Sequence, residues 1–320
     1  MTLHPAYVER FSLLEGIDSL EELMSDPELE ERFHAFMQWR DSAPPPDVPV
    51  RDTTVPGPHG PVPVRVYGEG AGDPRPAFVW MHGGAFMMGD LDMPEADRTS
   101  REVAHRAGAV VVSVDYRLAR DGVHYPVPLD DCVAVVRWVR DSALDLGVDP
   151  ARIAVGGASA GATLATGATL RVRDEDDWQP AALLPVYGMF HAVLPDPTDE
   201  MAASMADVPD LLRFTPESTA GVTANYLGGP PESADGYAMP ALADLAGLCP
   251  VWLYDAEYDD LRGSAEIFAT ALAAAGVDVG QHVAPGLMHG FTNLPAEIDA
   301  VGEVFQLMAD VVRTPTVNPS

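Results

Sequence analysis

Short apolar runs alternate with longer helical patterns through most of this sequence. Runs with the length and composition of buried strands occupy 77–81, 109–114, 152–155, 182–186, 251–254 and 277–283. Helical periodicity marks 94–107, 129–145, 160–171, 263–275 and 296–312. Strands that alternate with helices are joined by right-handed crossovers, because only that hand packs each helix back onto the sheet. The pattern therefore predicts an α/β fold with a mostly parallel, doubly wound sheet.

Three segments depart from this alternation. Valines alternate with other residues over 62–66, which is typical of an edge strand or a hairpin. Residues 18–40 have helical spacing, either as a helix packed on the core or as a lid over a pocket. Residues 188–240 contain Pro, Met and acidic clusters with one helical piece at 216–227, so we expect an insertion there.

The charge of the chain disfavours several classes of partner. The chain has 19 Lys and Arg but 49 Asp and Glu, which gives a formal net charge of −30. Lys and Arg attract phosphate backbones and anionic lipids, so we expect neither nucleic acid nor a membrane as a partner. The N-terminus lacks a signal-peptide pattern and no run reaches about 18 apolar residues, so we expect a cytoplasmic protein. Cys132 and Cys249 are expected to be reduced core residues.

A glycine-flanked serine lies between a predicted strand and a predicted helix. The segment Gly157-Ala158-Ser159-Ala160-Gly161 matches the G-x-S-x-G pattern. Such a turn strains the serine backbone, and the two glycines remove side chains that would clash there. It also places the hydroxyl at a helix N-terminus, where unpaired N–H groups favour negative charge. Ser159 is therefore the candidate nucleophile, with a serine that only caps the helix as the alternative.

A second glycine turn directly follows the first buried strand. The stretch that begins at His82 has the sequence HGGAF. Acyl transfer builds negative charge on a carbonyl oxygen, and backbone N–H groups that point into the cleft stabilise that charge. The predicted donors of this oxyanion hole are the N–H groups of Gly83, Gly84 and Ala160, with Ala85 as a further candidate. We expect the His82 side chain to anchor the loop through a hydrogen bond.

Three histidines are candidates for the general base. In the fold that carries a G-x-S-x-G elbow, the acid and then the histidine follow the serine along the chain. Only His191, His282 and His289 do so. His282 lies within the last predicted strand and His191 lies where the insertion begins, whereas His289 lies in a loop that can reach across the sheet. We therefore expect His289 to be the base.

Four acids follow the predicted strand 251–254. They are Asp255, Glu257, Asp259 and Asp260. Asp259 lies in the loop just before a predicted helix, a position that suits a carboxylate buried against an imidazole. The other three fit a solvated acidic face. The residues alone favour Asp259 without excluding the others.

Together these motifs resemble the bacterial hormone-sensitive-lipase-like carboxylesterases (family IV esterases) of the α/β-hydrolase superfamily. HGGAF is similar to the family's HGGGF, and VDYRLA from Val114 is similar to its VDYRLAP. YDAEYDDLR from Tyr254 resembles TAEYDPLRD, which carries the acid onto Asp259. PGLMHGF from Pro285 resembles PGMIHGF, which carries the base onto His289. The chain departs from the family at Ala85, Ala158 and Arg120, where the family has Gly, Asp and Pro, and we interpret these as changes in substrate fit.

The resemblance implies an α/β-hydrolase fold, with a mostly parallel eight-stranded sheet, helices on both faces and a helical cap. We expect N-terminal cap helices at 1–48, a catalytic domain at 49–187 and 241–314, a cap insertion at 188–240 and a tail at 315–320. The resemblance also suggests a homodimer. A triad of this kind implies no metal and no organic cofactor.

The predicted function is the hydrolysis of short- to medium-acyl esters by Ser159, His289 and Asp259 through an acyl-enzyme intermediate. An amidase, lactonase or deacetylase with the same triad is the first alternative. A non-catalytic receptor on a hydrolase scaffold is the second, disfavoured because serine, acid and base are all present. The net charge of −30 disfavours a third, a lipase acting at lipid surfaces.

Overall fold

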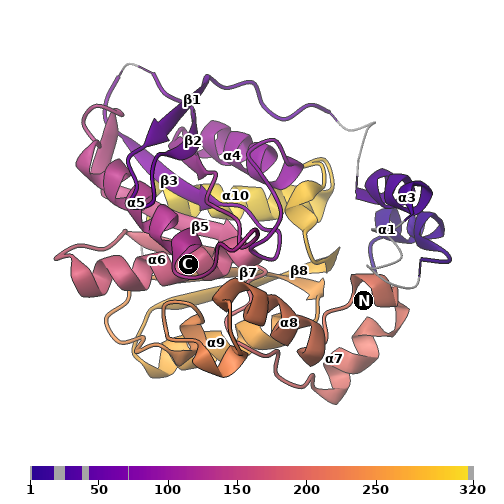
Figure 1. The fold of residues 1–320 in the computed structure, drawn as a ribbon. Coiled ribbons are helices and arrows are strands. Elements are labelled where there is room, and N and C mark those ends of the chain that lie inside the picture. The colour runs from indigo at the N-terminus through magenta and orange to yellow at the C-terminus, as the bar shows by residue number, and fades with distance from the viewer. Residues whose placement is uncertain (1, 18–25, 38–42, 71, 316–320) are drawn as a thin grey trace.

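One eight-stranded sheet runs through the molecule (Figure 1). The computed structural model describes residues 2–17, 26–37, 43–70 and 72–315. The strand order is β1-β2-β4-β3-β5-β6-β7-β8, in which β1 pairs with β2 and β2 with β4 antiparallel, and the other neighbours pair parallel. The strands are β1 Val50–Val55, β2 Val62–Tyr67, β3 Arg75–Met81, β4 Val110–Val114, β5 Val148–Ala158, β6 Ala182–Val186, β7 Val251–Tyr258 and β8 Val279–Met288. The predicted mostly parallel α/β sheet is confirmed.

Helices cover both faces of the sheet. α5 (Val127–Asp141), α6 (Ala160–Glu175) and α9 (Arg262–Ala274) belong to one apolar layer. α4 (Pro94–Ala107) and α10 (Asp299–Arg313) pack against each other in the second layer. Helices on both faces are what a doubly wound sheet requires, because each face of a parallel sheet must be buried.

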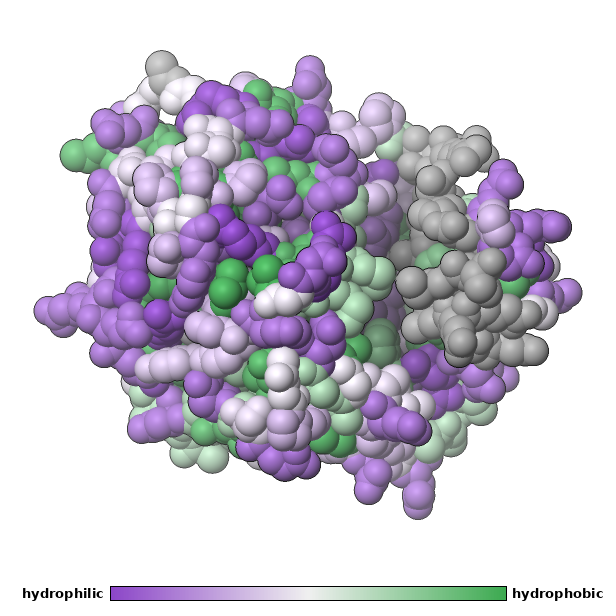
Figure 2. All heavy atoms as spheres, viewed as in Figure 1, coloured by the Kyte–Doolittle hydropathy of each residue, from purple (hydrophilic) through white to green (hydrophobic). Residues whose placement is uncertain are grey.

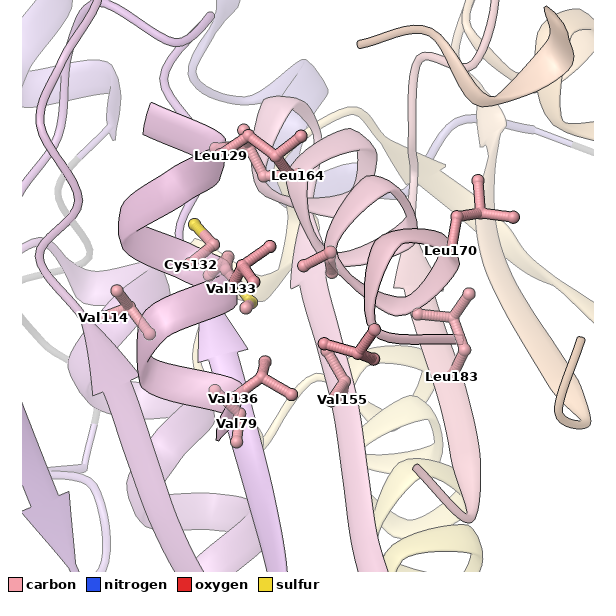
Figure 3. Close-up of a cluster of buried hydrophobic side chains, with 14 of the residues drawn as sticks. Val79, Val114, Leu129, Cys132, Val133, Val136, Val155, Leu164, Leu170 and Leu183 are labelled. Carbon is pink, nitrogen blue, oxygen red and sulfur yellow. The ribbon is translucent and has the colours of Figure 1, made fainter. Parts of the chain in front are cut away.

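Side chains of the central strands alternate between these two layers. In β3, Val79 lies in the layer of α5 and α6, whereas Phe78 and Trp80 lie in the layer of α4 and α10. Figure 3 shows the first layer, in which strand valines and Leu183 face side chains of α5 and α6. Cys132 lies in this layer; both it and Cys249 are buried and free, as predicted.

Most of the predicted elements are present, several of them with shifted bounds. The helices predicted at 94–107 and 216–227 occur at those bounds as α4 and α8. β1 was not predicted as a separate strand, because its first five residues (VRDTT) are mostly polar and lie outside the core, whereas Val55 at its end is buried. α5 runs over 127–141 instead of 129–145, since the proline that follows Val127 suits the first turn of a helix.

Two further parts of the chain lie outside the sheet and its helices. The N-terminal part forms α1 (Pro5–Val8), the 3₁₀ helix η1 (Phe11–Leu14) and α3 (Pro27–Met37). Of the helix predicted at 18–40, residues 18–25 and 38–40 lie outside the described residues. The segment after β6 contains α7 (Asp199–Ser204), α8 (Pro216–Leu227) and the short 3₁₀ helices η2 Met205–Asp207, η3 Asp210–Leu212, η4 Pro231–Ser233 and η5 Pro240–Leu242. α1 and α3 lie on the same side of the molecule as α7 (Figure 1). A last 3₁₀ helix, η6 (Phe291–Asn293), follows β8.

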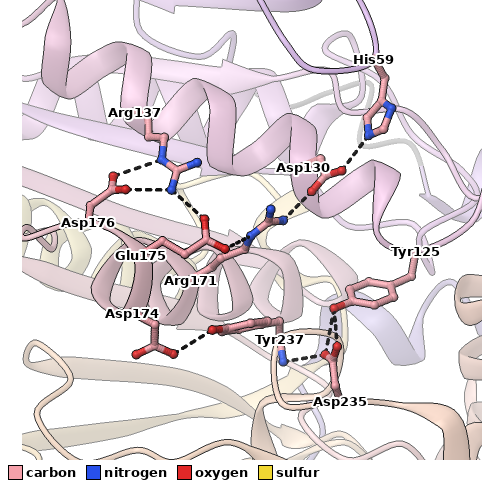
Figure 4. Close-up of polar contacts among 10 residues, drawn as sticks. All are labelled: His59, Tyr125, Asp130, Arg137, Arg171, Asp174, Glu175, Asp176, Asp235 and Tyr237. Carbon is pink, nitrogen blue, oxygen red and sulfur yellow. Dashed lines mark hydrogen bonds and ion pairs between the residues drawn. The ribbon is translucent and has the colours of Figure 1, made fainter.

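The surface is largely hydrophilic. Purple side chains cover most of the face seen in Figure 2, with small apolar patches between them. On α5 and α6 the arginines pair with neighbouring carboxylates (Figure 4). The end of the insertion joins this surface, because the Tyr125 hydroxyl donates to Asp235 and the Tyr237 hydroxyl donates to Asp174. Within the described residues, no helix combines the length and the apolar content needed to cross a bilayer.

Candidate active site

Ser159 occupies a sharp turn between a strand and a helix. β5 ends at Ala158, α6 begins at Ala160, and Ser159 itself has φ 53° and ψ −120°. A positive φ at a residue other than glycine costs about 1–3 kcal/mol and is typical of functional sites. The turn packs so closely on β3 that a Cβ at Gly161 would lie 2.2 Å from the carbonyl oxygen of Met81. Glycine at this position is therefore required by packing.

His289 and Asp259 meet Ser159 at the carboxyl edge of the sheet. Ser159 follows β5, Asp259 follows β7 and His289 follows β8. Nε2 of His289 lies 3.0 Å from Oγ of Ser159, and Nδ1 lies 2.7 Å from Oδ2 of Asp259. The N–H of Leu261 donates to Oδ1 of the buried Asp259 at 2.9 Å, which fixes the carboxylate. The structure thus brings the three residues predicted from the sequence into one hydrogen-bonded chain.

The glycine loop after β3 differs from the prediction at one donor. The N–H of Gly83 donates to Oε1 of Glu95 at 2.6 Å, so this group is occupied and does not face the cleft as a free donor. Within the described residues, the N–H groups of Gly84 and Ala85 donate to no protein acceptor. The N–H of Ala160 lies in the first turn of α6, where N–H groups have no partner within the helix. Gly84, Ala85 and Ala160 are therefore the available donors beside Ser159.

His82 anchors this loop, as expected. Its Nδ1 donates to the carbonyl oxygen of Gly83 at 2.7 Å, and its ring stacks on Tyr116 with centroids 4.4 Å apart. Burial lowers the pKa of His82, which keeps the imidazole neutral.

Comparison with known proteins agrees with the observed fold. Residues 78–293 match the family model described as alpha/beta hydrolase fold. The chain belongs to this family.

Several known esterases are similar to this hydrolase. It is 34% identical to the esterase LipI of Mycobacterium tuberculosis over 269 residues, 81% of this chain and 79% of the relative. It is 35% identical to the carboxylesterase NlhH of the same organism over 251 residues, 76% and 75% of the two chains. The solved structure of the hyperthermophilic esterase from Pyrobaculum calidifontis has a TM-score of 0.82 at 30% identity, covering 99% of this chain and 100% of that one. The resemblance to the hormone-sensitive-lipase-like carboxylesterases is confirmed.

The other three acids that follow Tyr254 do not form the solvated face that the sequence suggested. β7 extends to Tyr258, so Glu257 lies in the strand, where its Oε2 accepts the N–H of Gly286 at 2.7 Å. Asp255 is buried, and burial raises its pKa to about 7. Asp260 is also buried, and its carboxylate binds a residue of the insertion. These contacts leave Asp259 as the carboxylate against His289.

The other two candidate histidines of this hydrolase lie elsewhere. Nδ1 of His191 lies 2.8 Å from Oγ of Ser264, where the insertion begins, and His282 lies within β8 beside Tyr254. Within the described chain, no group of three His, Cys, Asp or Glu side chains is arranged to hold a metal ion.

Three residues near the triad were not singled out from the sequence. Glu95 is buried at the start of α4, and burial raises its pKa to about 7. The ring of Tyr187 packs edge-on against His289 with centroids 4.8 Å apart. The ring of Phe214, from the insertion, packs edge-on against the same imidazole at 4.7 Å. An acid in the first turn of the helix after the glycine loop is the one sequence signal that could have identified Glu95.

The insertion is attached next to the triad acid. Nε and Nη2 of Arg213 donate to the two oxygens of Asp260 at 2.8 and 2.9 Å. The N–H of Phe214 donates to the same carboxylate at 2.8 Å. This contact places the Phe214 ring on His289 in the hydrolase.

Proposed function

We propose that this hydrolase is a carboxylesterase that cleaves short- to medium-acyl esters through an acyl-enzyme intermediate. The observation that carries the proposal is the chain from Oγ of Ser159 through His289 to Asp259, set beside N–H groups without protein acceptors. Its relatives and structural neighbours are named esterases, which supports the same class of reaction. A non-catalytic receptor would need no such chain.

In the proposed reaction, His289 accepts the proton of Ser159 while Oγ attacks the ester carbonyl. The oxyanion that forms accepts hydrogen bonds from the N–H groups of Gly84, Ala85 and Ala160. Asp259 holds the imidazole with Nδ1–H toward it and stabilises the charged imidazolium. His289 then donates the proton to the leaving alkoxide. Water repeats the sequence and releases the acid.

We further propose that residues 1–48 and 188–240 form a cap over the acyl pocket. Tyr7, from the N-terminal part, accepts the N–H of Met288 on its hydroxyl at 3.4 Å, directly beside the base. Phe214, from the insertion, lies on the imidazole of His289. Because aromatic side chains occupy the space next to the triad, we expect short acyl chains to fit best.

The test is a chain-length series of p-nitrophenyl esters with Ser159→Ala beside it. Removing a triad nucleophile costs on the order of 10⁶ in kcat, so we expect almost no turnover of the acetate. Ser142→Ala, at the end of α5, is the matched control and should keep normal turnover. A serine-directed phosphonate should label Ser159. Near-normal turnover by Ser159→Ala, or a label on another residue, would exclude this triad.

A homodimer and a cytoplasmic location are proposed from the resemblance and the sequence. Sedimentation of the purified protein should give twice the mass of the 34.1 kDa chain. Fractionation of the source cells should recover the protein with cytoplasmic markers. A monomer mass or a membrane-associated pool would overturn the respective proposal.

A further inference from the structure

One buried carboxylate holds the first N–H of the glycine loop. Oε1 of Glu95 accepts the N–H of Gly83 at 2.6 Å, and the side chain is 3% exposed. Glu95 lies in the first turn of α4, where the helix dipole stabilises negative charge. A Cβ built on Gly83 would lie 2.9 Å from Oε2 of Glu95 and 3.3 Å from Cβ of Ser159. The carboxylate is therefore packed against the loop within a few ångströms of the nucleophile.

The same residue reaches the loop that carries the base. The hydroxyl of Tyr187 donates to Oε2 of Glu95 at 3.2 Å and also hydrogen-bonds to Thr292. The backbone N–H of Glu95 donates to Oδ1 of Asn293 at 3.2 Å. Tyr187 in turn packs against the ring of His289. Glu95 thus contacts both the glycine loop and the segment that follows His289. The reaction needs the donors of the first and the base beside the second at a fixed distance from each other.

Each of the two peptide groups around Gly83 has a side-chain partner. Glu95 binds the N–H of Gly83, which belongs to the peptide before it. His82 binds the carbonyl oxygen of Gly83, which belongs to the peptide after it. In a trans peptide the C=O and the N–H point in opposite directions. A carbonyl held on His82 therefore directs the N–H of Gly84 to the other side of the loop.

We propose that Glu95 is a positioning residue for ester hydrolysis, which fixes the loop so that the N–H groups of Gly84 and Ala85 are presented to the oxyanion. The inference rests on the proposed function, since it assumes an oxyanion next to Ser159. Loss of one oxyanion donor costs about 10²–10³ in kcat, and a donor that is misdirected part of the time should cost less. The hydrogen bonds strengthen only in the transition state, so the loss should fall on kcat and leave KM almost unchanged.

The test compares three variants by turnover of p-nitrophenyl acetate, expressed per phosphonate-labelled site. Glu95→Ala removes the acceptor, and we expect kcat to fall about tenfold to a hundredfold with KM within about threefold. Glu95→Gln keeps an oxygen that can accept the Gly83 N–H, and it should recover kcat to within about fivefold of the wild type. The matched control is Asp97→Asn in the same helical turn, because Asp97 binds Tyr67 and Arg101 away from the loop. It should keep the wild-type values.

Three results would overturn the inference: a kcat of Glu95→Ala equal to that of Asp97→Asn, a loss in Glu95→Gln as large as in Glu95→Ala, or a loss confined to KM. If Glu95→Ala does not fold, Glu95→Met fills the same space without an acceptor and carries the same expectations. A phosphonate label outside Ser159 would instead overturn the proposed function. A label on Ser159 with unchanged kcat in Glu95→Ala would overturn the positioning role alone.

Discussion

The sheet and the insertion that lies against its carboxyl edge differ in how they are linked to the triad. The sheet is buried between two apolar layers; all five residues of β4, for example, are buried. The insertion also contributes side chains to both apolar layers, among them Phe190, Tyr226 and Met205. Next to the triad acid, however, its link is polar, through the bidentate pair of Arg213 with Asp260 and the N–H of Phe214. Apolar packing over a large area is strong and cooperative, whereas a single partly exposed ion pair contributes about 1 kcal/mol. A substitution at this ion pair can therefore move the residues over the pocket without unfolding the sheet.

The largest expected effect is on the sheet side of this comparison. Leu164 of α6 is fully buried in the first apolar layer, and Leu164→Ala should destabilise folding by about 3–5 kcal/mol through lost burial and a cavity. Because the triad lies on loops beyond this layer, kcat per labelled site should stay within about twofold of the wild type. Urea unfolding and active-site titration measure the two quantities. Leu144→Ala is the control, since Leu144 is 85% exposed. A fall in kcat of Leu164→Ala without a loss of folding stability would contradict the claim that this core residue affects folding and not the triad.

A second prediction concerns the pH dependence of stability. Burial raises the pKa of Glu95 to about 7, so between its ordinary value of 4.5 and 7 the folded protein keeps a proton that the unfolded chain has released. The free energy of unfolding should therefore fall as pH rises through this window, by on the order of 3 kcal/mol from this carboxyl. Tyr187 and His289 face the same carboxyl, and the positive form of His289 would lessen the effect.

Glu95→Gln should remove this part of the pH dependence. Urea unfolding at pH 5 and pH 8 should show a smaller loss of stability in the variant than in the wild type. Asp255→Asn is the matched comparison, because the pKa of Asp255 is also raised to about 7 by burial and its removal should flatten the curve independently. If the free energy of unfolding falls by the same amount between pH 5 and pH 8 in the wild type and in Glu95→Gln, this pH dependence does not come from Glu95.

The smallest effect is expected at the link between insertion and triad loop. Arg213→Ala should raise KM about threefold to tenfold, because Phe214 is no longer held over the pocket, with kcat changed less than about threefold. Steady-state kinetics across the ester series measures this. The charge-reversed pair Arg213→Asp with Asp260→Arg should recover part of the loss. Arg152→Ala removes an ion pair with Asp149 remote from the insertion and should change nothing. If Arg213→Ala and Arg152→Ala change KM equally, the ion pair between the insertion and Asp260 has no special role at the pocket.

The triad and the strands that carry it were largely predictable, because each has a signal in the local sequence. Ser159 lies in a turn whose flanking glycines are required by packing against neighbouring backbone, so the pattern is visible in five consecutive residues. Asp259 and His289 each follow a strand of clear apolar character. The exposed edge strand β1 has no such pattern, because its polar residues face solvent.

The contacts that surround the triad and the glycine loop were not predictable, because they join residues distant in sequence. Gly83 was expected to be a free donor, and only the folded chain brings Glu95 to its N–H. Asp260 was interpreted as part of a solvated acidic face, yet it is buried by Arg213, 47 residues earlier in the chain. Glu95 has a local signal, as an acid in the first turn of the helix after the glycine loop, but the local sequence does not indicate which partner either acid has.

The neighbouring acids Asp259 and Asp260 provide the most direct test of the central claim. One binds the imidazole of His289 and the other binds Arg213. Asp259→Asn should lower kcat by about 10⁴, because the imidazole loses the carboxylate that sets its tautomer, whereas Asp260→Asn should change mainly KM, by about tenfold or less. Equal kcat values for the two variants, or a larger loss in Asp260→Asn, would contradict the triad.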